Sequence, residues 1–264
     1  MRRAKVLAAL GDPVRLAVVD LLFDGDRCAD SLAELCGIRG NLLAHHLRVL
    51  TAAGLIGRRR SAADGRRAYL RLLPAALTGL LPMADAEPDP KAPGAVSGAR
   101  AATPSARLTP AVAPYQVDSL LFVCTENSAR SVLAEALWGE VSEVPSSSAG
   151  TQPAPRINPG ARAAARRAGL TGIRLVPQSL PPSIPAGALI VSVCDAAGEG
   201  LAIEDHPHLH WSIPDPVPAG SPAAFDEVVN ELRQRIGRLA PRTARRPVPR
   251  RRSRRSGSDP HPCT

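Results

Sequence analysis

The sequence contains no apolar run that approaches the roughly 18 residues that a membrane-spanning helix needs. Its start, MRRAKVLAALGDPVR, lacks the long apolar stretch and small-residue cleavage site of a secretory signal. Cysteines are few and odd in number, which argues against a disulfide framework; they are Cys28, Cys36, Cys124, Cys194 and Cys263. We therefore expect a soluble, cytoplasmic protein with reactive or metal-binding thiols.

Charge is distributed unevenly along the 264 residues, a length that suggests two domains. Residues 1–83 hold 13 Lys and Arg against 7 Asp and Glu, and residues 241–264 hold 8 against 1. The body between them, 116–240, is acidic, with 9 against 13. Only the two basic ends have the charge expected for contact with a polyanion such as DNA.

Two segments lack the composition of a packed domain. Residues 84–115 are rich in Pro and Ala, with six prolines, which predicts a semi-extended linker between the domains 1–83 and 116–240. The stretch 241–264 is rich in Arg, Pro and Ser, which predicts a disordered tail. The tail is expected either to add salt-sensitive DNA affinity or to remain a solvated extension.

The first domain has the periodicity and turn signals of a mainly α winged helix-turn-helix. After Gly54, two segments of alternating polarity flank a turn at Ala63-Asp64-Gly65, which predicts a β-hairpin with a basic tip. Four helical segments precede the hairpin: Lys5 to Leu10, Val14 to Phe23, Ser31 to Cys36 and Gly40 to Ala53.

The fourth helical segment has the features of a helix that enters the DNA major groove. Leu43, Leu47 and Leu50 are expected to face inward, which leaves polar side chains outward, and the basic hairpin lies nearby for phosphates. For the histidines, the alternative is that they cap or solvate an ordinary helix. The predicted DNA-binding residues are Asn41, His45, His46, Arg48, Arg58, Arg59, Arg66 and Arg67.

The segments LGDPVRLAVVDLL, SLAELCGI and NLLAHHLRVLTAAGLI, with the wing, resemble the ArsR-type winged-helix repressors over roughly residues 4–73. The resemblance implies a homodimer that binds double-stranded DNA and leaves it when a metal or metalloid binds. Many members carry a Cys-Val-Cys motif where this chain reads Cys28-Ala29-Asp30. Cys28 alone makes a poor metal or metalloid site, and Cys36 is expected to be a buried structural thiol.

Strand and helix patterns alternate in the second domain, which predicts an α/β fold with a small parallel sheet. Val117 to Val123 and Ala188 to Val193 are apolar runs typical of buried strands. Helical periodicity is found in Ala129 to Val141, Asn158 to Ala168 and Ala223 to Leu239.

A cysteine and an arginine separated by five residues follow the first of these strands, in Cys124-Thr125-Glu126-Asn127-Ser128-Ala129-Arg130-Ser131. A loop of this length can direct its backbone N–H groups at one tetrahedral oxyanion, which makes Thr125 to Ser131 the predicted oxyanion-binding residues. Arg130 is expected to grip two oxyanion oxygens, and the same field is expected to lower the pKa of the Cys124 thiol. Ser131 is expected to donate to the thiolate, and Asn127 to brace the loop.

A cysteine nucleophile of this kind needs a proton donor for the departing oxygen. Asp215, in the proline-flanked sequence HWSIPDPVPAG, is the best candidate, and Asp195 beside Cys194 is its rival. The carboxylates of Glu126 and Asp205 are predicted to be solvated surface charges.

Several motifs together resemble the low-molecular-weight tyrosine phosphatase and arsenate reductase superfamily over roughly residues 117–239: VCTENSARS, Ser148-Ala149-Gly150-Thr151, Asn158-Pro159, VSVCDAAGEG and Asp215-Pro216. Three details favour arsenate: Ala129 replaces a second loop cysteine, no aromatic residue follows Pro216, and Cys194 stands where reductases keep a resolving thiol. The resemblance implies that Cys124 attacks arsenate, after which Cys194 or a small thiol attacks the Cys124 sulfur and releases arsenite.

Thioredoxin-coupled members carry a further cysteine seven residues past the resolving one, where this chain has Leu201. The resemblance therefore implies no bound cofactor and an external reductant, either thioredoxin or a low-molecular-weight thiol with a glutaredoxin-like protein. Cys263 is a substitute thiol or a stray exposed one, and the alternative for Cys194 is a buried small residue at a strand end.

The sequence thus predicts an arsenic-resistance regulator fused to a thiol-dependent arsenate reductase with residual phosphatase activity. Two alternatives stay open. One is a DNA-binding regulator whose second domain only senses oxyanions or oxidants, and the other is a protein-tyrosine phosphatase tethered to DNA.

Overall fold

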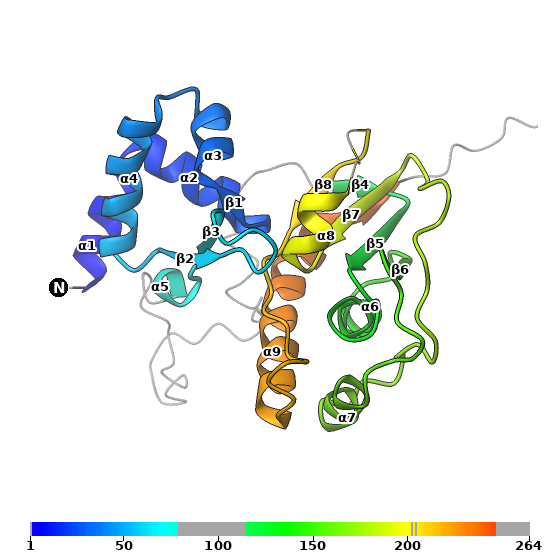
Figure 1. Ribbon diagram of the computed structural model, residues 1–264. Coiled ribbons are helices and arrows are strands. Elements are labelled where there is room, and N and C mark those ends of the chain that lie inside the picture. Colours follow the sequence, from blue (N-terminus) through cyan, green and yellow to red (C-terminus); the bar gives the residue numbers. More distant parts are fainter. Residues whose placement is uncertain (1, 79–114, 202, 204, 247–264) are drawn as a thin grey trace, which may run out of the picture.

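The computed structural model describes residues 2–78, 115–201, 203 and 205–246 (Figure 1). Nearly all of the predicted linker, and the tail from residue 247 with Cys263, lie outside the described residues. Within the described part of the chain, no helix has the length and apolar character that crossing a bilayer requires.

Local signals set the helix ends of the first domain. Asp12 caps the second helix by accepting from the Arg15 amide at 3.0 Å, and Pro13 occupies its first position. Gly37, with a left-handed φ of 64°, ends the third helix and opens the tight turn to the fourth. The helices are α1 (Arg2–Leu10), α2 (Pro13–Asp24), α3 (Ala29–Cys36), α4 (Gly40–Ala52) and α5 (Ala75–Thr78).

A three-stranded antiparallel sheet completes the first domain and confirms the predicted winged helix-turn-helix. Its order is β1-β3-β2, with Ile56 opposite Leu72 at the base of the hairpin. Leucines from α2, α3 and α4 fill the core beneath it, since Leu22, Leu32 and Leu50 are at most 2% exposed. The strands are β1 (Arg27–Cys28), β2 (Ile56–Arg60) and β3 (Ala68–Leu72).

The second domain has a four-stranded parallel sheet in the order β6-β5-β7-β8, which confirms the predicted α/β fold. β5 and β7 lie in the middle and are almost wholly buried, as the apolar runs predicted. The strands are β5 (Ser119–Cys124), β6 (Ser146–Gly150), β7 (Ala188–Ser192) and β8 (His208–His210).

Helices cover this sheet and carry its core side chains. α6, α7 and α9 lie together below the sheet in the view of Figure 1, whereas α8 lies beside β7 and β8, close to the wing. Trp138, Phe122 and Phe225 are at most 2% exposed between the sheet and these helices. The helices are α6 (Arg130–Val141), α7 (Pro159–Arg167), α8 (Asp195–Gly200) and α9 (Pro222–Leu239).

The fold extends into the segment predicted to be a disordered tail, so that prediction is wrong for residues 241–246. A 3₁₀ turn at Ala240–Arg242 leads into β9 (Thr243–Arg245), which pairs in parallel with β4 (Tyr115–Val117). The Arg242 guanidinium forms an ion pair with Asp24 of the first domain. Long-range pairing of this kind leaves no signal in an Arg-rich composition.

The two domains share a polar interface centred on Asp26. Arg235 of α9 donates to both Asp26 carboxylate oxygens at 2.9 Å, and the two side chains are only 6% and 1% exposed. Asp26 Oδ2 also accepts from the Ser212 amide at 2.8 Å, and Trp211 Nε1 donates to the Asp24 carbonyl at 2.7 Å. The first domain therefore holds the segment that follows β8.

Candidate functional site

Cys124 ends the central strand β5 and lies at the bottom of the loop that leads into α6. Its side chain is buried, with 2% of the residue exposed. The sulfur accepts a hydrogen bond from the Asn127 amide at 3.2 Å and lies 3.0 Å from Ser131 Oγ. The loop thus curls around the sulfur, and Ser131 lies where the sequence analysis expected it.

Asn127 braces this loop by bonds to three separate segments. Its backbone has a positive φ of 50°, and the residue is fully buried. The Nδ2 group donates to Ser131 Oγ at 2.8 Å and to Ser148 Oγ at 2.9 Å, while Oδ1 accepts from the Gln178 amide at 2.7 Å. The predicted brace is therefore in contact with β6 and with the segment before β7.

Sequence reasoning missed two residues that extend this brace. Ser148 donates to Glu135 Oε2 at 2.6 Å, and Arg174 in turn donates to the Glu135 carboxylate at 2.7 Å. Ser148 lies within Ser148-Ala149-Gly150-Thr151, a segment that carries the resemblance to the phosphatase and reductase superfamily, so the sequence pointed to this residue without indicating its role. Glu135 stands in the mostly apolar run VLAEAL of α6, where a single carboxylate among apolar residues was the available sign.

Arg130 and Asp215 face each other across the mouth of the loop. Their side chains form an ion pair with Nη2 and Oδ2 at 3.1 Å, and Arg130 Nη1 donates to the Ile213 carbonyl at 3.2 Å. Arg130 is 12% exposed and Asp215 39% exposed. Arg130 Nε is buried and has no partner among the described residues, so one donor is free for a bound anion. This places the predicted anion grip and the predicted proton donor together.

The expected lowering of the Cys124 pKa is not found. Burial raises the pKa of the Cys124 thiol, and the nearby Cys194 adds to this rise, while Ser131 and Arg130 act in the opposite direction. The prediction failed because the sequence did not reveal that the sulfur is buried or that the Arg130 charge is paired with Asp215.

Cys194 places a second buried thiol at the same edge of the sheet. It caps the N-terminus of α8, it is 2% exposed, and its sulfur lies 3.5 Å from Thr125 Oγ1 in the Cys124 loop. The neighbouring Asp195 is only 4% exposed, and it accepts from the Ala62 amide at 2.7 Å and contacts His210 Nε2 at 3.1 Å. Asp195 is thus committed to structural contacts, which favours Asp215 over it as the proton donor.

In the first domain, most of the predicted DNA-binding side chains are exposed to solvent. Asn41, His45 and Arg48 are exposed on α4, and Arg58, Arg66 and Arg67 are exposed on the wing. Glu126 and Asp205 of the second domain are exposed too, in agreement with their predicted surface positions.

Two predicted DNA contacts are corrected by their positions. His46 is 7% exposed and its Nδ1 lies 3.5 Å from Asp12 Oδ1, because α4 turns this residue toward the start of α2. Arg59 points to the second domain, where it bonds to the Ser212 carbonyl and lies 3.5 Å from Glu231. Both side chains therefore make contacts within the protein and are not available for DNA in this structure.

The residues present do not form a metal site in the described part of the chain, where no group of three or more His, Cys, Asp and Glu converges. Cys28 caps α3 and is partly buried. Cys36 is also partly buried, against the apolar core, where burial raises the pKa of its thiol. It is thus less enclosed than the sequence predicted, and Cys28 has no convergent co-ligand.

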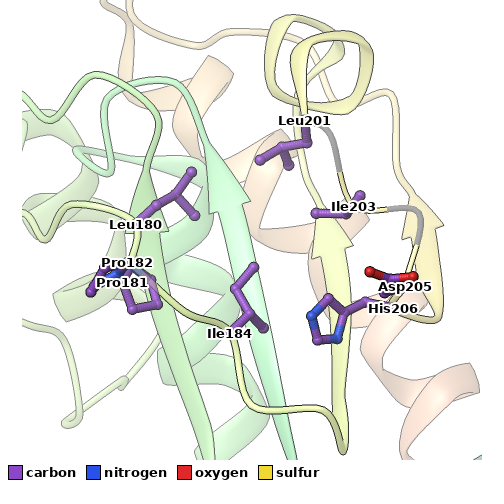
Figure 2. A pocket seen from close by; sticks show the side chains of 8 residues that line it. All are labelled: Leu180, Pro181, Pro182, Ile184, Leu201, Ile203, Asp205 and His206. Atoms are coloured by element: carbon purple, nitrogen blue, oxygen red, sulfur yellow. The ribbon is translucent and has the colours of Figure 1, made fainter.

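A separate pocket, lined mostly by apolar side chains, lies between the segment before β7 and the connection from α8 to β8 (Figure 2). Leu201 and Ile184 face it from opposite sides. Leu201 stands at the position where thioredoxin-coupled reductases carry a third cysteine, so here that position lines an apolar pocket. The full lining is Leu180, Pro181, Pro182, Ile184, Leu201, Ile203, Asp205 and His206.

Comparisons with known proteins agree with this division of the chain. Residues 119–249 match the family model of the low molecular weight phosphotyrosine protein phosphatases, and residues 10–59 match that of a helix-turn-helix domain. The chain joins a helix-turn-helix domain to a low molecular weight phosphatase-type domain. The phosphatase-type domain holds Cys124, Arg130 and Asp215, and the helix-turn-helix domain holds the exposed α4 face.

The helix-turn-helix domain is similar to the HTH-type transcriptional repressor SmtB of Mycobacterium tuberculosis, with 37% identity over 68 residues. That alignment covers 26% of this chain and 48% of the repressor, so the chain spans about half the length of the curated relatives it matches.

Solved structures similar to the phosphatase-type domain include reductases and phosphatases. An arsenate reductase from Archaeoglobus fulgidus is 28% identical, with 47% of this chain and 99% of that chain covered and a TM-score of 0.42. YwlE from Bacillus subtilis is 24% identical, with coverages of 47% and 96% and a TM-score of 0.41. A thioredoxin-dependent arsenate reductase from Corynebacterium glutamicum is 22% identical, with coverages of 47% and 60% and a TM-score of 0.38.

Proposed function

We propose that the protein is an arsenic-responsive transcription regulator of the cytoplasm whose phosphatase-type domain reduces arsenate to arsenite with thiols. One observation carries the proposal: a second buried thiol, Cys194, lies beside the Cys124 loop, 3.5 Å from Thr125. Ester hydrolysis needs one nucleophilic cysteine, whereas two-electron reduction needs a second thiol to accept the covalent bond.

The chemistry follows from the four functional side chains. The Cys124 thiol gives up its proton as its sulfur attacks arsenic, while Arg130 and the loop hold the other oxygens. Asp215, displaced from Arg130 by the anion, takes up that proton and delivers it to the oxygen that leaves as water. The Cys194 thiolate then attacks the Cys124 sulfur, the sulfur–arsenic bond breaks, and its electron pair stays on arsenic. The products are arsenite, water and a Cys124–Cys194 disulfide, so two electrons pass from two thiols to arsenic.

Turnover requires an external thiol to reduce that disulfide. The residue seven positions after Cys194 is Leu201, so no third cysteine at that position carries the oxidation to the surface. A thioredoxin, or a low-molecular-weight thiol with a glutaredoxin-like protein, supplies the two electrons by thiol–disulfide exchange. No bound cofactor takes part.

The helix-turn-helix domain is proposed to bind operator DNA as a homodimer. Exposed Asn41, His45 and Arg48 supply polar groups for base edges, and the exposed wing arginines supply phosphate contacts. Paired half-sites suit a twofold protein.

Steady-state reduction of arsenate by the full chain with a thiol donor tests the enzymatic part. We expect turnover that Cys124→Ser abolishes and that Cys194→Ser lowers by at least a hundredfold. Mass spectrometry after a single turnover should detect the Cys124–Cys194 crosslink. A wild-type protein that binds arsenate without consuming thiol would overturn the proposal and leave only an oxyanion sensor.

A phosphatase is the second candidate, because the arrangement of Cys124, Arg130 and Asp215 also suits phosphate-ester hydrolysis. A chromogenic aryl phosphate separates the two activities. Under our proposal ester hydrolysis is slow and survives Cys194→Ser, since that thiol takes no part in it. Rapid ester hydrolysis with no arsenate reduction would favour the phosphatase.

A further inference from the structure

Helix α8 connects the thiol chemistry to the DNA-binding wing. The helix is six residues long, and Cys194 is its N-cap. The next residue, Asp195, accepts a hydrogen bond from the backbone amide of Ala62 in the wing at 2.7 Å. The thiol that would form the disulfide is therefore one peptide bond away from a residue that holds the wing.

The other end of α8 binds the wing as well. Glu199 Oε1 accepts from Ser61 Oγ at 2.7 Å and from the Tyr69 hydroxyl at 3.0 Å. Ser61 and Tyr69 are 6% and 8% exposed and Glu199 is partly buried, so these bonds are partly shielded from water. Hydrogen bonds to a carboxylate are among the stronger polar contacts in proteins.

His210 of β8 adds a third contact, in addition to those that Asp195 and Glu199 make with the wing. Its Nε2 lies 3.1 Å from Asp195 Oδ1, its Nδ1 lies 2.9 Å from Ser192 Oγ, and its ring lies 4.4 Å from the Tyr69 ring. The network therefore fixes α8 against both the sheet and the wing. A displacement of Asp195 disturbs a wing side chain and a wing backbone amide together.

The wing has a second face that is exposed to solvent, where, among the described residues, Arg66 and Arg67 pair only with Asp64 of the wing itself. Arg58, Arg60, Arg66 and Arg67 are exposed, whereas Ser61 and Tyr69 on the same hairpin are buried against the second domain. Hence the position of the arginines that face solvent is set by contacts of the opposite face with α8.

We propose that the oxidation state of Cys194 controls DNA affinity through α8: the dithiol form holds the wing for DNA binding, and the Cys124–Cys194 disulfide releases it. The step rests on the proposed function, in which arsenate takes two electrons from the two thiols. A disulfide needs its sulfurs about 2.05 Å apart. In this proposal Cys194 moves toward Cys124, and because Cys194 is the N-cap of α8, the first turn of the helix moves with it and disturbs the bond from the Ala62 amide to Asp195.

The test measures operator affinity of the full chain in two redox states. The probe is a fluorescent duplex selected from a random pool by the dithiol protein, and affinity is read by anisotropy at fixed salt. Diamide oxidises the two thiols to the disulfide and is itself reduced by two electrons to a hydrazine, and arsenate serves as a second oxidant. Mass spectrometry scores the crosslink in each sample.

We expect the disulfide form to bind the duplex about five- to fiftyfold more weakly than the dithiol form, whereas Cys194→Ser shows no change with diamide. Glu199→Ala should weaken binding of the dithiol form about fivefold and should abolish the redox response, although the crosslink still forms. Tyr69→Phe, which keeps the ring, should do the same more weakly. Glu140→Ala, at an exposed position of α6, is the matched control.

The outcomes separate the two proposals. If diamide forms the crosslink and affinity drops, but arsenate forms none, the reductase proposal fails and the coupling through α8 stands. If the crosslink forms and affinity is unchanged, the coupling is wrong. If neither diamide nor arsenate forms the crosslink, the redox control of DNA affinity is overturned as well, and Glu199→Ala then tests only whether α8 positions the wing.

Linkage supplies a reciprocal check. If the disulfide weakens DNA binding by a given factor, saturating duplex must favour the dithiol form by the same factor. The equilibrium between the two forms in a thiol redox buffer, measured with and without duplex, should shift by that factor. An unchanged equilibrium beside a changed affinity would show that the affinity change came from another modification.

Discussion

Asn127, within the Cys124 loop, and Gly150, packed against it, both fix the conformation of this loop. Asn127 bonds to Ser131, Ser148 and the Gln178 amide, which makes the loop rigid before any ligand arrives. Gly150 ends β6 directly against the loop backbone. The site therefore depends on the hydrogen bonds of the Asn127 side chain and on the absence of a side chain at Gly150.

Gly150→Ala should remove oxyanion binding. A Cβ at this position would lie 2.7 Å from the Thr125 carbonyl oxygen and 2.9 Å from the Asn127 amide nitrogen, so the loop backbone must move. We expect phosphate or arsenate to protect Cys124 from alkylation at least tenfold less well than in the wild type. Gly139→Ala is the control, because a Cβ there meets open space in α6 and should stabilise the helix by up to about 1 kcal/mol. Equal protection in both variants would contradict this role for Gly150.

His208 makes stability depend on pH. Burial, with the nearby charges of His210 and Arg27, lowers the pKa of His208 to about 4 from an ordinary value near 6.5. Between these values the unfolded chain binds more protons, so stability falls as the pH drops through the window and is fully present above it. We expect this residue to contribute a slope of up to about 1.4 kcal/mol per pH unit.

Denaturant unfolding of the wild type and of His208→Gln at several pH values checks this. The difference between their stabilities should shrink or reverse from pH 6.5 to 4, and it should be constant above pH 7. A constant difference across the whole range would show that His208 does not titrate as inferred.

At the scale of elements, the wing is a hairpin with two different faces. Alternation along β2 exposes Arg58 and Arg60 and turns Arg59 toward Glu231. Arg71 of β3 joins Arg59 there, 3.0 Å from the same carboxylate. Neighbouring arginines in one short strand thus have opposite surroundings.

Arg58→Ala and Arg59→Ala should therefore separate DNA binding from interface stability. Arg58→Ala should weaken binding across all duplex sequences and reduce the slope of log K against log salt by about 1, with unchanged unfolding. Arg59→Ala should lower the free energy of unfolding by about 1–2 kcal/mol and leave the salt slope as it is, because its bonds go to Ser212 and Glu231. Interchanged results would mean that the hairpin faces DNA with its other side.

The positions of elements with strong local signals were predictable. The strands β6 and β8 were not predicted, because SSSAG contains no apolar run and HLH is only three residues long. Asp12-Pro13 and Gly37 fixed helix ends, and apolar runs located β5 and β7. Whether a given side chain on these elements faces solvent or the interior was less predictable. His46 and Arg59 each have polar neighbours in the sequence, so the pattern does not distinguish them from exposed residues. Only the folded structure shows that His46 packs against the start of α2 and that Arg59 packs against the second domain.

At the scale of the whole molecule, the interface around Asp26 makes the two domains one structural unit. Asp26 and Arg235 are separated by 209 residues, so no local pattern could predict their pairing. By contrast, Cys124 and Arg130 are close in sequence and could be paired by spacing alone. Asp215 could be added only through resemblance, and the ion pair with Arg130 supports that choice.

Asp26→Ala should loosen both the interface and the candidate active site. It removes both bonds from the buried Arg235 to Asp26 and leaves Glu231, 2.9 Å away, as the remaining acidic partner of Arg235, a loss of about 1–3 kcal/mol. It also removes the acceptor of the Ser212 amide, in the segment that leads to Asp215. We expect the single unfolding transition of the wild type to split into two, and turnover with arsenate to fall.

Asp26→Leu combined with Arg235→Met is the matched control, because it removes both charges and keeps volume. This double variant should recover most of the lost stability. If Asp26→Ala unfolds in one transition at the wild-type denaturant concentration, the ion pair does not hold the domains together.

The ion pairs of Asp24 with Arg242 and of Asp26 with Arg235 join the two halves independently of the peptide between them. A protease cut within residues 79–114 should therefore yield two fragments that co-elute as a stoichiometric complex. Separately expressed fragments 1–78 and 115–264 should reconstitute it on mixing. The covalent join then acts by raising the effective concentration of one half near the other, while the fit between them is already encoded in their surfaces.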